Sequence, residues 1–437
     1  MSTREPPRGS GVYRTPGLFF DWRAAEGAAP STVPSGVPLF VGLTGRSNAR
    51  SDAPPLYRFT RWEQFDQLFP GAGVSSLLAC AIRGFFENGG GLCYVKPLDL
   101  DPDEPADYRQ DMKRDMARDV PYAEKLAAAI SAPFEPRGIL DDLEDVDLVC
   151  VPDIMTREIA SSPERVFELQ ACVVEYCART GDRFAILDVR AGDPANVTSA
   201  GAHAMLFDAM GQWQTLPPNY GAIYFPWIRV ASHRTASGTP STVLVPPCGH
   251  VAGVFARSDR RVGVHKPPAN ELLEGALDLG FDIGDSDQAI LNDAGVNCLR
   301  ESRGWGIRVW GARTLSDRPA WMYVNVTRVM LTLKRWLEFN MRDLVFEPNN
   351  PALWLLIEER LERYCSDLYR RGALQGNSAA EAYFVKCDSE TNALVSRDSG
   401  IVVAEVGVAP ASPSEFVIVR ITQSANGVNV TVPTAWQ

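Results

Sequence analysis

Alternation between apolar runs and amphipathic stretches dominates the middle of the chain. Short, continuous apolar runs predict buried strands, and apolar residues at every third or fourth position predict helices. Together they predict strand, helix, strand, helix and strand over Val146–Val151, Glu164–Arg179, Arg183–Val189, Ala200–Gln214 and Gly221–Val230. This order, with strands that are apolar throughout, is typical of a parallel sheet that helices cover on both faces. We therefore predict an α/β middle region.

The preceding part of the chain contains further predicted elements. They are a strand, two helices and a strand, over Val37–Leu43, Trp62–Phe69, Ser75–Asn88 and Leu92–Pro97. The glycines Gly89–Gly91 are predicted to end the second helix, because glycine readily adopts the left-handed conformation found at helix C-termini. Charged residues then dominate Asp99–Asp147, within which Tyr122–Ser131 is predicted to be helical.

After Arg303 the pattern changes to a strand, two long helices and several strands, which indicates an α+β domain. The two helices and the last strands are predicted over Val324–Leu344, Ala352–Arg371, Tyr383–Cys387, Gly400–Val408 and Glu415–Thr422. The fold class predicted for the whole chain is α/β and α+β multidomain. It combines a parallel α/β middle segment, a C-terminal α+β domain, and extended strand arms at both ends.

The strand that starts at Gly306 alternates between two faces. Val309 lies on one predicted face and Trp310 on the other, and Gly311 permits a bulge or turn after them. We expect Trp310 and Trp354 to be packing residues, so that replacing Trp310 by alanine in a closed core would cost about 3–5 kcal/mol.

Both ends of the chain carry apolar residues outside the predicted core. They are Val12, Tyr13, Leu18, Phe19 and Phe20 at one end and Val428, Val430 and Val432 at the other. Such segments are either frayed termini or strands that complete a sheet in another molecule. We favour strand-forming arms, because an added strand gains backbone hydrogen bonds at a free sheet edge.

Composition narrows the class of protein. A length of 437 residues allows two or three domains, and the net charge of −11 favours solubility and argues against a nucleic-acid binder. No run approaches the roughly 18 apolar residues of a membrane helix, and Met1–Pro16 lacks the apolar segment of a signal peptide. The nine cysteines are expected to be reduced and mostly buried.

Candidate chemistry is sparse. None of the four histidines, His203, His233, His250 and His265, has a partner at metal-ligand spacing. No phosphate-binding glycine motif follows the first strand of the α/β region, since Gly89–Gly91 closes a helix instead of opening one. We therefore predict no catalytic, cofactor-binding or metal-binding residues. An enzyme that uses the middle α/β segment stays open as an alternative.

One basic stripe is a candidate binding surface. Arg360, Arg363, Asp367 and Arg371 lie at helical spacing along one flank of Ala352–Arg371. Such a stripe is either a solvated face or, in an acidic protein, a surface that meets an acidic partner.

Several strings of residues occur together in a fixed order. The strongest is Gly306–Thr314, with Gly306, Val309, Trp310, Gly311 and Arg313, and the others are Val245–Asp259, Lys266–Glu271, Leu291–Asn297, Phe346–Asn349, Gly372–Gly376 and Tyr383–Asp388. This series closely resembles the contractile tail sheath proteins of phages and phage-like injection systems. The resemblance covers most of the chain, but it is weak between Asp99 and about Ala222.

The resemblance implies a structural subunit, not an enzyme. It implies helical polymerisation around an inner tube, contraction that drives the tube through a target envelope, and arms that complete a sheet in neighbouring subunits. It places the C-terminal domain, with Arg360, Arg363 and Arg371, towards the tube. The implied partners are other copies, the inner tube protein, and baseplate and terminator proteins, without nucleic acid or stable membrane insertion. Assembly is implied in the bacterial cytoplasm, as part of a phage tail or phage-like particle.

Five segments are expected along the chain. They are an N-terminal arm over 1–22, the N-terminal part of the core over 23–98, a variable α/β segment over 99–244, the C-terminal sheath domain over 245–423, and a C-terminal arm over 424–437. A second structural possibility is a non-contracting cap or baseplate-proximal adaptor with the same fold.

Overall fold

The computed structural model describes residues 33–44, 55–70, 76–98, 119–190, 208–218, 220–232, 241–302, 304–393, 401–415, 420–424 and 427–431. The predicted arm residues Val12, Tyr13, Leu18, Phe19, Phe20 and Val432 lie outside these ranges. None of the helices within them is long and apolar enough to cross a membrane.

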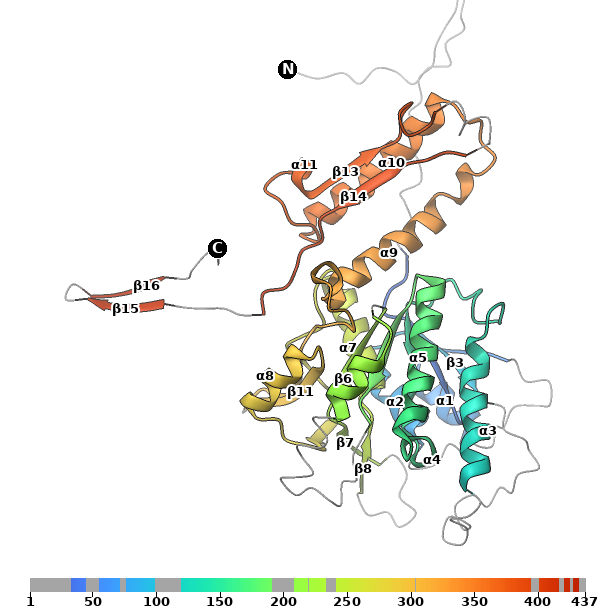
Figure 1. Cartoon of the computed structure of the whole chain (residues 1–437), viewed down its shortest axis with the longest axis vertical. Coiled ribbons are helices and arrows are strands. Elements are labelled where there is room, and N and C mark those ends of the chain that lie inside the picture. Colours follow the sequence, from blue (N-terminus) through green and yellow to red (C-terminus); the bar gives the residue numbers. More distant parts are fainter. Residues whose placement is uncertain are drawn as a thin grey trace, which may run out of the picture. The chain divides into compact units, whose positions relative to one another are not determined.

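A nine-stranded sheet forms the centre of the fold (Figure 1). Its order is β2 (Tyr57–Phe59), β3 (Cys93–Pro97), β1 (Pro38–Gly42), β4 (Leu148–Cys150), β5 (Phe184–Asp188), β6 (Gly221–Phe225), β11 (Asn297–Ser302), β12 (Gly306–Trp310) and β9 (Glu271–Leu272). The strands from β3 to β11 pair in parallel, while β2, β12 and β9 pair antiparallel at the two ends. The predicted parallel α/β region is confirmed, and the sheet takes strands from three of the expected segments.

Two apolar clusters lie on the two faces of this sheet. Adjacent residues of β1 and of β5 belong to different clusters, because side chains alternate along a strand: Leu39 and Ala185 lie in one cluster, Phe40 and Phe184 in the other. The first cluster also holds residues of α3 (Asp119–Ser131), α4 (Arg157–Ala160), α5 (Pro163–Thr180), the helical stretch 208–215 and α8 (Asp285–Asp293). The second holds residues of α1 (Trp62–Leu68), α2 (Leu77–Glu87), α7 (Cys248–Arg261) and α9 (Val324–Asn340).

Glycines in the left-handed conformation follow two helices, and the helix end predicted at Gly89–Gly91 is confirmed. Gly89, after α2, has φ +96°, and Gly181, after α5, has φ +66°. Ser76 and Ser162 start the same two helices, each accepting a hydrogen bond from a backbone amide of the first turn. Short 3-10 turns complete the connections at η2 (Ala132–Phe134), η3 (Pro152–Met155), η5 (Pro319–Trp321) and η6 (Arg342–Leu344).

The single strand predicted over Gly221–Val230 is wrong. It divides at Pro226 into β6 and β7 (Ile228–Ala231), and β7 lies in a separate three-stranded antiparallel sheet of order β10-β7-β8. Its neighbours are β8 (Thr242–Val245) and β10 (Ala276–Leu279). Proline has no amide hydrogen to donate to a ladder, so it interrupts a central strand.

The C-terminal region begins with α9, which leads from the large sheet (Figure 1) to α10 (Pro351–Arg370), α11 (Ala379–Ala382) and the antiparallel pair β13 (Tyr383–Lys386) and β14 (Glu405–Val408). The rings of Trp336 on α9 and Tyr364 on α10 stack, with 4.1 Å between their centroids. Asn350 starts α10 by accepting hydrogen bonds from the amides of Ala352 and Leu353. The predicted α+β character of this region is confirmed.

The chain end forms a hairpin. β15 (Arg420–Ser424) pairs antiparallel with β16 (Gly427–Thr431), which contains Val428 and Val430. The sequence predicts an unpaired, alternating tail from residue 424 onward, and the structure instead pairs the described part of that tail with the strand before it. A strand with an alternating pattern takes an available partner, and here the nearest partner is in its own chain.

Candidate assembly surfaces

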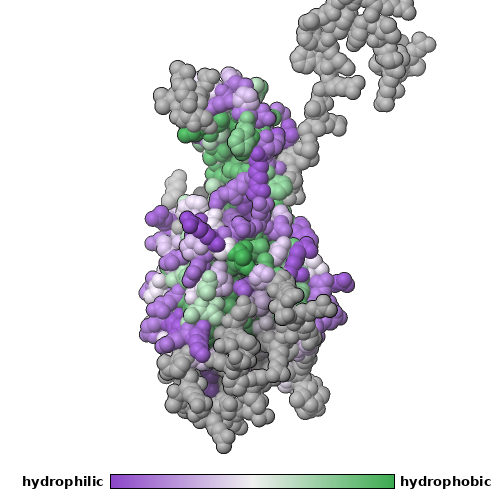
Figure 2. Space-filling model, turned by 90° about the vertical axis from the view of Figure 1, so that its right-hand side faces the viewer, coloured by the Kyte–Doolittle hydropathy of each residue, from purple (hydrophilic) through white to green (hydrophobic). Residues whose placement is uncertain are grey.

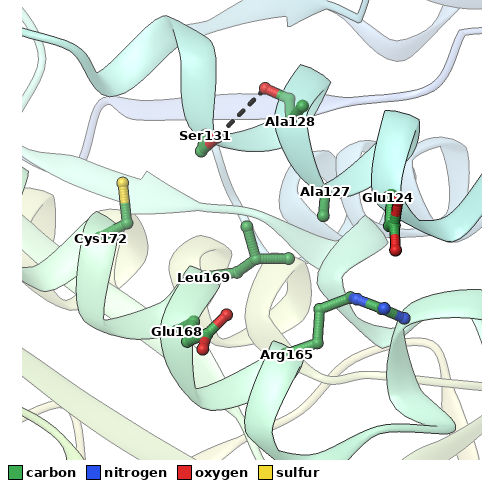
Figure 3. Close-up of a pocket in the computed structure, with 8 residues that line it drawn as sticks. All are labelled: Glu124, Ala127, Ala128, Ser131, Arg165, Glu168, Leu169 and Cys172. Atoms are coloured by element: carbon green, nitrogen blue, oxygen red, sulfur yellow. Dashed lines mark hydrogen bonds between the residues drawn. The ribbon is translucent and has the colours of Figure 1, made fainter.

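The groove between α3 and α5 tests the enzyme alternative, since it lies in the middle α/β segment (Figure 3). This cavity of about 400 Å³ is lined by Glu124, Ala127, Ala128, Ser131, Arg165, Glu168, Leu169 and Cys172. The Ser131 hydroxyl donates to the Ala128 carbonyl of its own helix at 3.1 Å. Burial raises the pKa of the Cys172 thiol, so this sulfur stays protonated. The lining therefore presents no nucleophile activated by a base.

Two buried acids, Asp153 and Asp188, lie just after β4 and at the end of β5, where α/β enzymes often place their sites. Asp188 accepts the amide of Cys248, the first residue of α7, at 2.8 Å. Asp153 accepts the amides of Leu43 and Leu78. Both carboxyl groups therefore cap backbone amides, which is a structural role.

Other reactive groups are also placed structurally. Burial lowers the pKa of His250 to about 4, which leaves its ring neutral. All nine cysteines are free and seven of them are buried, in line with the expectation of reduced thiols. Within the described ranges, no three His, Cys, Asp or Glu side chains are grouped so that they could hold a metal ion. Where the structure describes them, these residues therefore have packing roles.

The three predicted tube-facing arginines lie along or just after α10, and each pairs with an acid of its own chain. Arg360 reaches both oxygens of Asp343, at 2.7 and 2.8 Å, and lowers the pKa of that carboxyl. Arg363 pairs with Glu359 at 2.8 Å, and Arg371 with Asp367 at 2.8 Å. The stripe is therefore less positive than its arginines alone predict, since Glu359 and Asp367 lie four positions before Arg363 and Arg371 on the same helix.

Exposed apolar residues surround α10, and the sequence analysis missed them. They are Val345, Phe346, Leu355, Leu356, Phe384, Ile401 and Val403. Figure 2 shows hydrophobic residues gathered at the end of the molecule that α10, β13 and β14 occupy in Figure 1. The signal was the run of five apolar residues Leu353–Ile357, since only part of a helix circumference can face its own core.

Asn349 joins parts of this apolar surface. Its side chain donates to the carbonyl of Ile401 at 3.0 Å and accepts from the indole nitrogen of Trp354 at 2.8 Å. Phe346, three residues earlier, is fully exposed and has φ +74°, a strained backbone for a residue with a side chain. Exposed apolar groups held by a defined scaffold are typical of protein–protein contact surfaces.

The β13–β14 pair is a candidate acceptor for an added strand. No described strand pairs with the outer edge of either member. Phe384 of β13 is 57% exposed and its ring lies over Gly407 of β14, where a Cβ atom would collide with it. A two-stranded sheet with free edges is only marginally stable by itself and presents unpaired amides and carbonyls to a partner.

The motif around β12 is structural, and one expectation about it is wrong. Val309 is fully buried, but Trp310 is 40% exposed and does not lie in a closed core. Alternation along the strand explains the difference, since Trp310 points to the face opposite Val309. Trp354, by contrast, is 5% exposed and packs as predicted.

Asn297 on β11 ties the end of this motif to the sheet. Its side chain donates to the carbonyls of Ile223 at 3.2 Å and Arg313 at 2.7 Å, and accepts the Arg313 amide at 2.7 Å. Gly311 lies against Asn297, leaving no room for a Cβ atom. Arg313 then forms a two-armed ion pair with Glu415 at 3.1 and 2.7 Å. The motif thereby holds the described segment that ends at Glu415.

Comparisons with known proteins agree with this arrangement. Residues 139–315 match the phage tail sheath protein central domain, and residues 316–424 match the phage tail sheath C-terminal domain. The tail sheath protein of Escherichia phage P2 is 32% identical over 96 residues, which are 21% of this chain and 24% of that protein. The chain thus spans about a quarter of the length of the curated relatives that it matches.

Solved structures extend the likeness to nearly the whole chain. The sheath complex of PVC, an extracellular contractile injection system, in its contracted state is 25% identical with a TM-score of 0.69, covering 95% of this chain and 99% of that one. The contracted helical sheath of the anti-feeding prophage is 26% identical with a TM-score of 0.67, covering 94% and 100%. The chain therefore belongs to the phage tail sheath family, the structural subunits of contractile sheaths.

Proposed function

We propose that this chain polymerises helically around an inner tube and that the polymer contracts to drive the tube through a target envelope. The observation that carries the proposal is the match, along nearly the full length of both chains, to subunits of sheaths in the contracted state. The proposed partners are other copies, an inner tube protein, and baseplate and terminator proteins. The particle is assembled in the bacterial cytoplasm, and the subunit performs no chemistry of its own.

Strand addition is the proposed link between neighbouring subunits. The arm residues Val12, Tyr13, Leu18, Phe19 and Phe20 of one copy, together with the strand that contains Val428 and Val430, add to the free edges of β13–β14 in its neighbours. At about 0.5–1.5 kcal/mol for each hydrogen bond, five bonds contribute several kcal/mol before the entropy of ordering the arm is subtracted. Such arms keep subunits connected while their cores change position.

The tube-facing surface is proposed on α10. Arg360, Arg363 and Arg371 meet acidic side chains of the tube by exchanging their present partners. Exposed ion pairs contribute about 0–1 kcal/mol each, so exchange costs little and release during contraction is easy. The exposed Leu355 and Leu356 supply apolar contact beside them.

Electron microscopy of the purified full-length protein tests the proposal. We expect long, hollow, ribbed cylinders. Deleting residues 1–20 is expected to leave a folded, soluble monomer without long tubes, because β1 and the rest of the described core begin later in the chain. Circular dichroism checks the fold of the deletion variant. Cylinders of ordinary length from that variant would contradict the role of the N-terminal arm.

The same images address the alternative of a non-contracting cap or adaptor with the sheath fold. An adaptor occupies one layer of a particle and needs no continuous lattice. Isolated rings or short stacks that never lengthen with protein concentration would favour the adaptor and contradict the sheath.

A further inference from the structure

The segment Pro34–Val37 leads into β1, and side chains from other parts of the chain hydrogen-bond to its backbone. The amides of Gly36 and Val37 donate to the two carboxylate oxygens of Asp147, at 3.0 and 2.7 Å. Gly36 has φ +70° and lies directly against Ala256, so no side chain fits there. The backbone therefore turns into the sheet along one defined path.

Arg328 on α9 fixes the carboxylate that holds this turn. It is 2% exposed and donates to Asp147 at 2.9 Å and to both oxygens of Asp259, at 2.9 and 2.6 Å. Its guanidinium carbon lies 4.9 Å from the ring centroid of Phe255, and Asp259 is also hydrogen-bonded to the side chain of Ser35. One buried cation thus connects α9, the start of β4 and the turn.

Arg335 holds the segment one step earlier. It is 4% exposed and donates to the carbonyl of Pro34 at 2.8 Å, and to the carbonyls of Glu144 and Asp145 at 3.0 and 3.1 Å. A cavity of about 290 Å³ lies beside Val33 and Pro34.

Both arginines project from the same face of α9, since they are seven positions, or about two turns, apart. A buried ion group is by itself weak evidence for stability, because apolar replacements of similar volume are often equally stable. The position of the two arginines explains their burial better than stability does. Together their side chains hold the segment just before β1, the first described strand.

We propose that Arg328 and Arg335 are positioning residues for assembly, which fix the path of residues 34–37, through which the N-terminal arm is joined to β1. A pull on the arm by a neighbouring subunit is then carried into α9 and does not peel β1 from the sheet. This inference rests on the proposed function, in which the arm of one copy adds to the sheet of another.

The decisive variant is Arg335→Met, which keeps an apolar stem and removes the hydrogen bonds to the carbonyls of Pro34, Glu144 and Asp145. Its matched control is Arg342→Met, which removes the exposed pair between Arg342 and Glu144 beside the same loop. We expect both variants to melt within about 5 °C of the wild type. In Arg335→Met alone, the amides at 35–37 should exchange hydrogen about tenfold faster.

Electron microscopy then separates positioning from stability. We expect Arg335→Met to lose long sheaths, or to form sheaths that break on contraction, while Arg342→Met behaves as wild type. Arg335→Lys, which keeps a donor for the Pro34 carbonyl, should restore part of the length. Intact sheaths of wild-type length from Arg335→Met would overturn the inference, as would unchanged exchange at 35–37. Failure of the proposed function is distinct, because the wild-type protein would then form no long sheaths.

Discussion

At the scale of single residues, two buried carboxyl groups connect the large sheet to the helices that cover it. Asp153 and Asp188 cap the amides that begin α2 and α7, so each joins a strand end to a helix start. Burial raises the pKa of each carboxyl from 3.8 to about 7, even though backbone amides act in the opposite direction. The folded state therefore binds these two protons more tightly than the unfolded chain does.

A pH dependence of stability follows from these raised pKa values. The contribution of each group favours folding below about pH 4 and is lost as the pH rises through about 7. The unfolding free energy should therefore fall as the pH rises, and we expect Asp188→Asn to make this fall smaller. The difference is at most about 4 kcal/mol, since each pKa unit corresponds to about 1.4 kcal/mol. Urea unfolding of the monomer at pH 5 and pH 8 measures this. Asp317→Asn, at an exposed position, serves as control, and an unchanged slope in Asp188→Asn would contradict the argument.

The two tryptophans make a paired prediction. Trp354→Ala is expected to cost about 3–5 kcal/mol, since it empties a buried site and leaves the Asn349 side chain without a donor. Trp310→Ala is expected to cost about 1 kcal/mol or less, because its side chain is partly in solvent already. Chemical denaturation of the two variants measures the difference, and equal losses of stability would disprove it.

At the scale of elements, α10 carries the clearest prediction. Leu355 is 65% exposed, so Leu355→Gln should change the unfolding free energy by no more than about 0.5 kcal/mol. If α10 faces the tube, the same change should reduce the amount of inner tube protein that co-purifies with the sheath, while empty sheaths still form. Leu277→Gln, at a position 61% exposed on β10, is the matched control. Equal tube content in both variants would remove Leu355 from the contact.

The β15–β16 hairpin gives a prediction for the whole molecule. Deleting residues 425–437 removes β16 and leaves β15 without its partner. We expect the body to stay folded, because the described core ends before this hairpin, and long sheaths to be lost. Thermal melting and electron microscopy of the truncated chain test the two halves of this statement. Long sheaths from the truncated chain would show that the hairpin is dispensable for assembly.

Local pattern was sufficient for many elements. Apolar periodicity placed β1, β3, β4, β5 and the two long C-terminal helices, because the burial of one or both faces of an element determines which of its residues are apolar. It did not predict β11, α7 or α8. Glycine likewise marked the end of α2, at Gly89. The ordered strings around Gly306–Thr314 carried the family assignment, since they record packing requirements such as the close contact of Gly311 with Asn297.

Tertiary structure alone decided which distant residues meet. Arg328 and Asp147 are 181 positions apart, and no local pattern relates them. The same holds for the pair of Arg360 with Asp343, for the placement of β7 in a second sheet, and for the exposure of Trp310. Local periodicity reports which side of an element is apolar, whereas pairing, sheet order and solvent exposure depend on chain segments that only folding brings together.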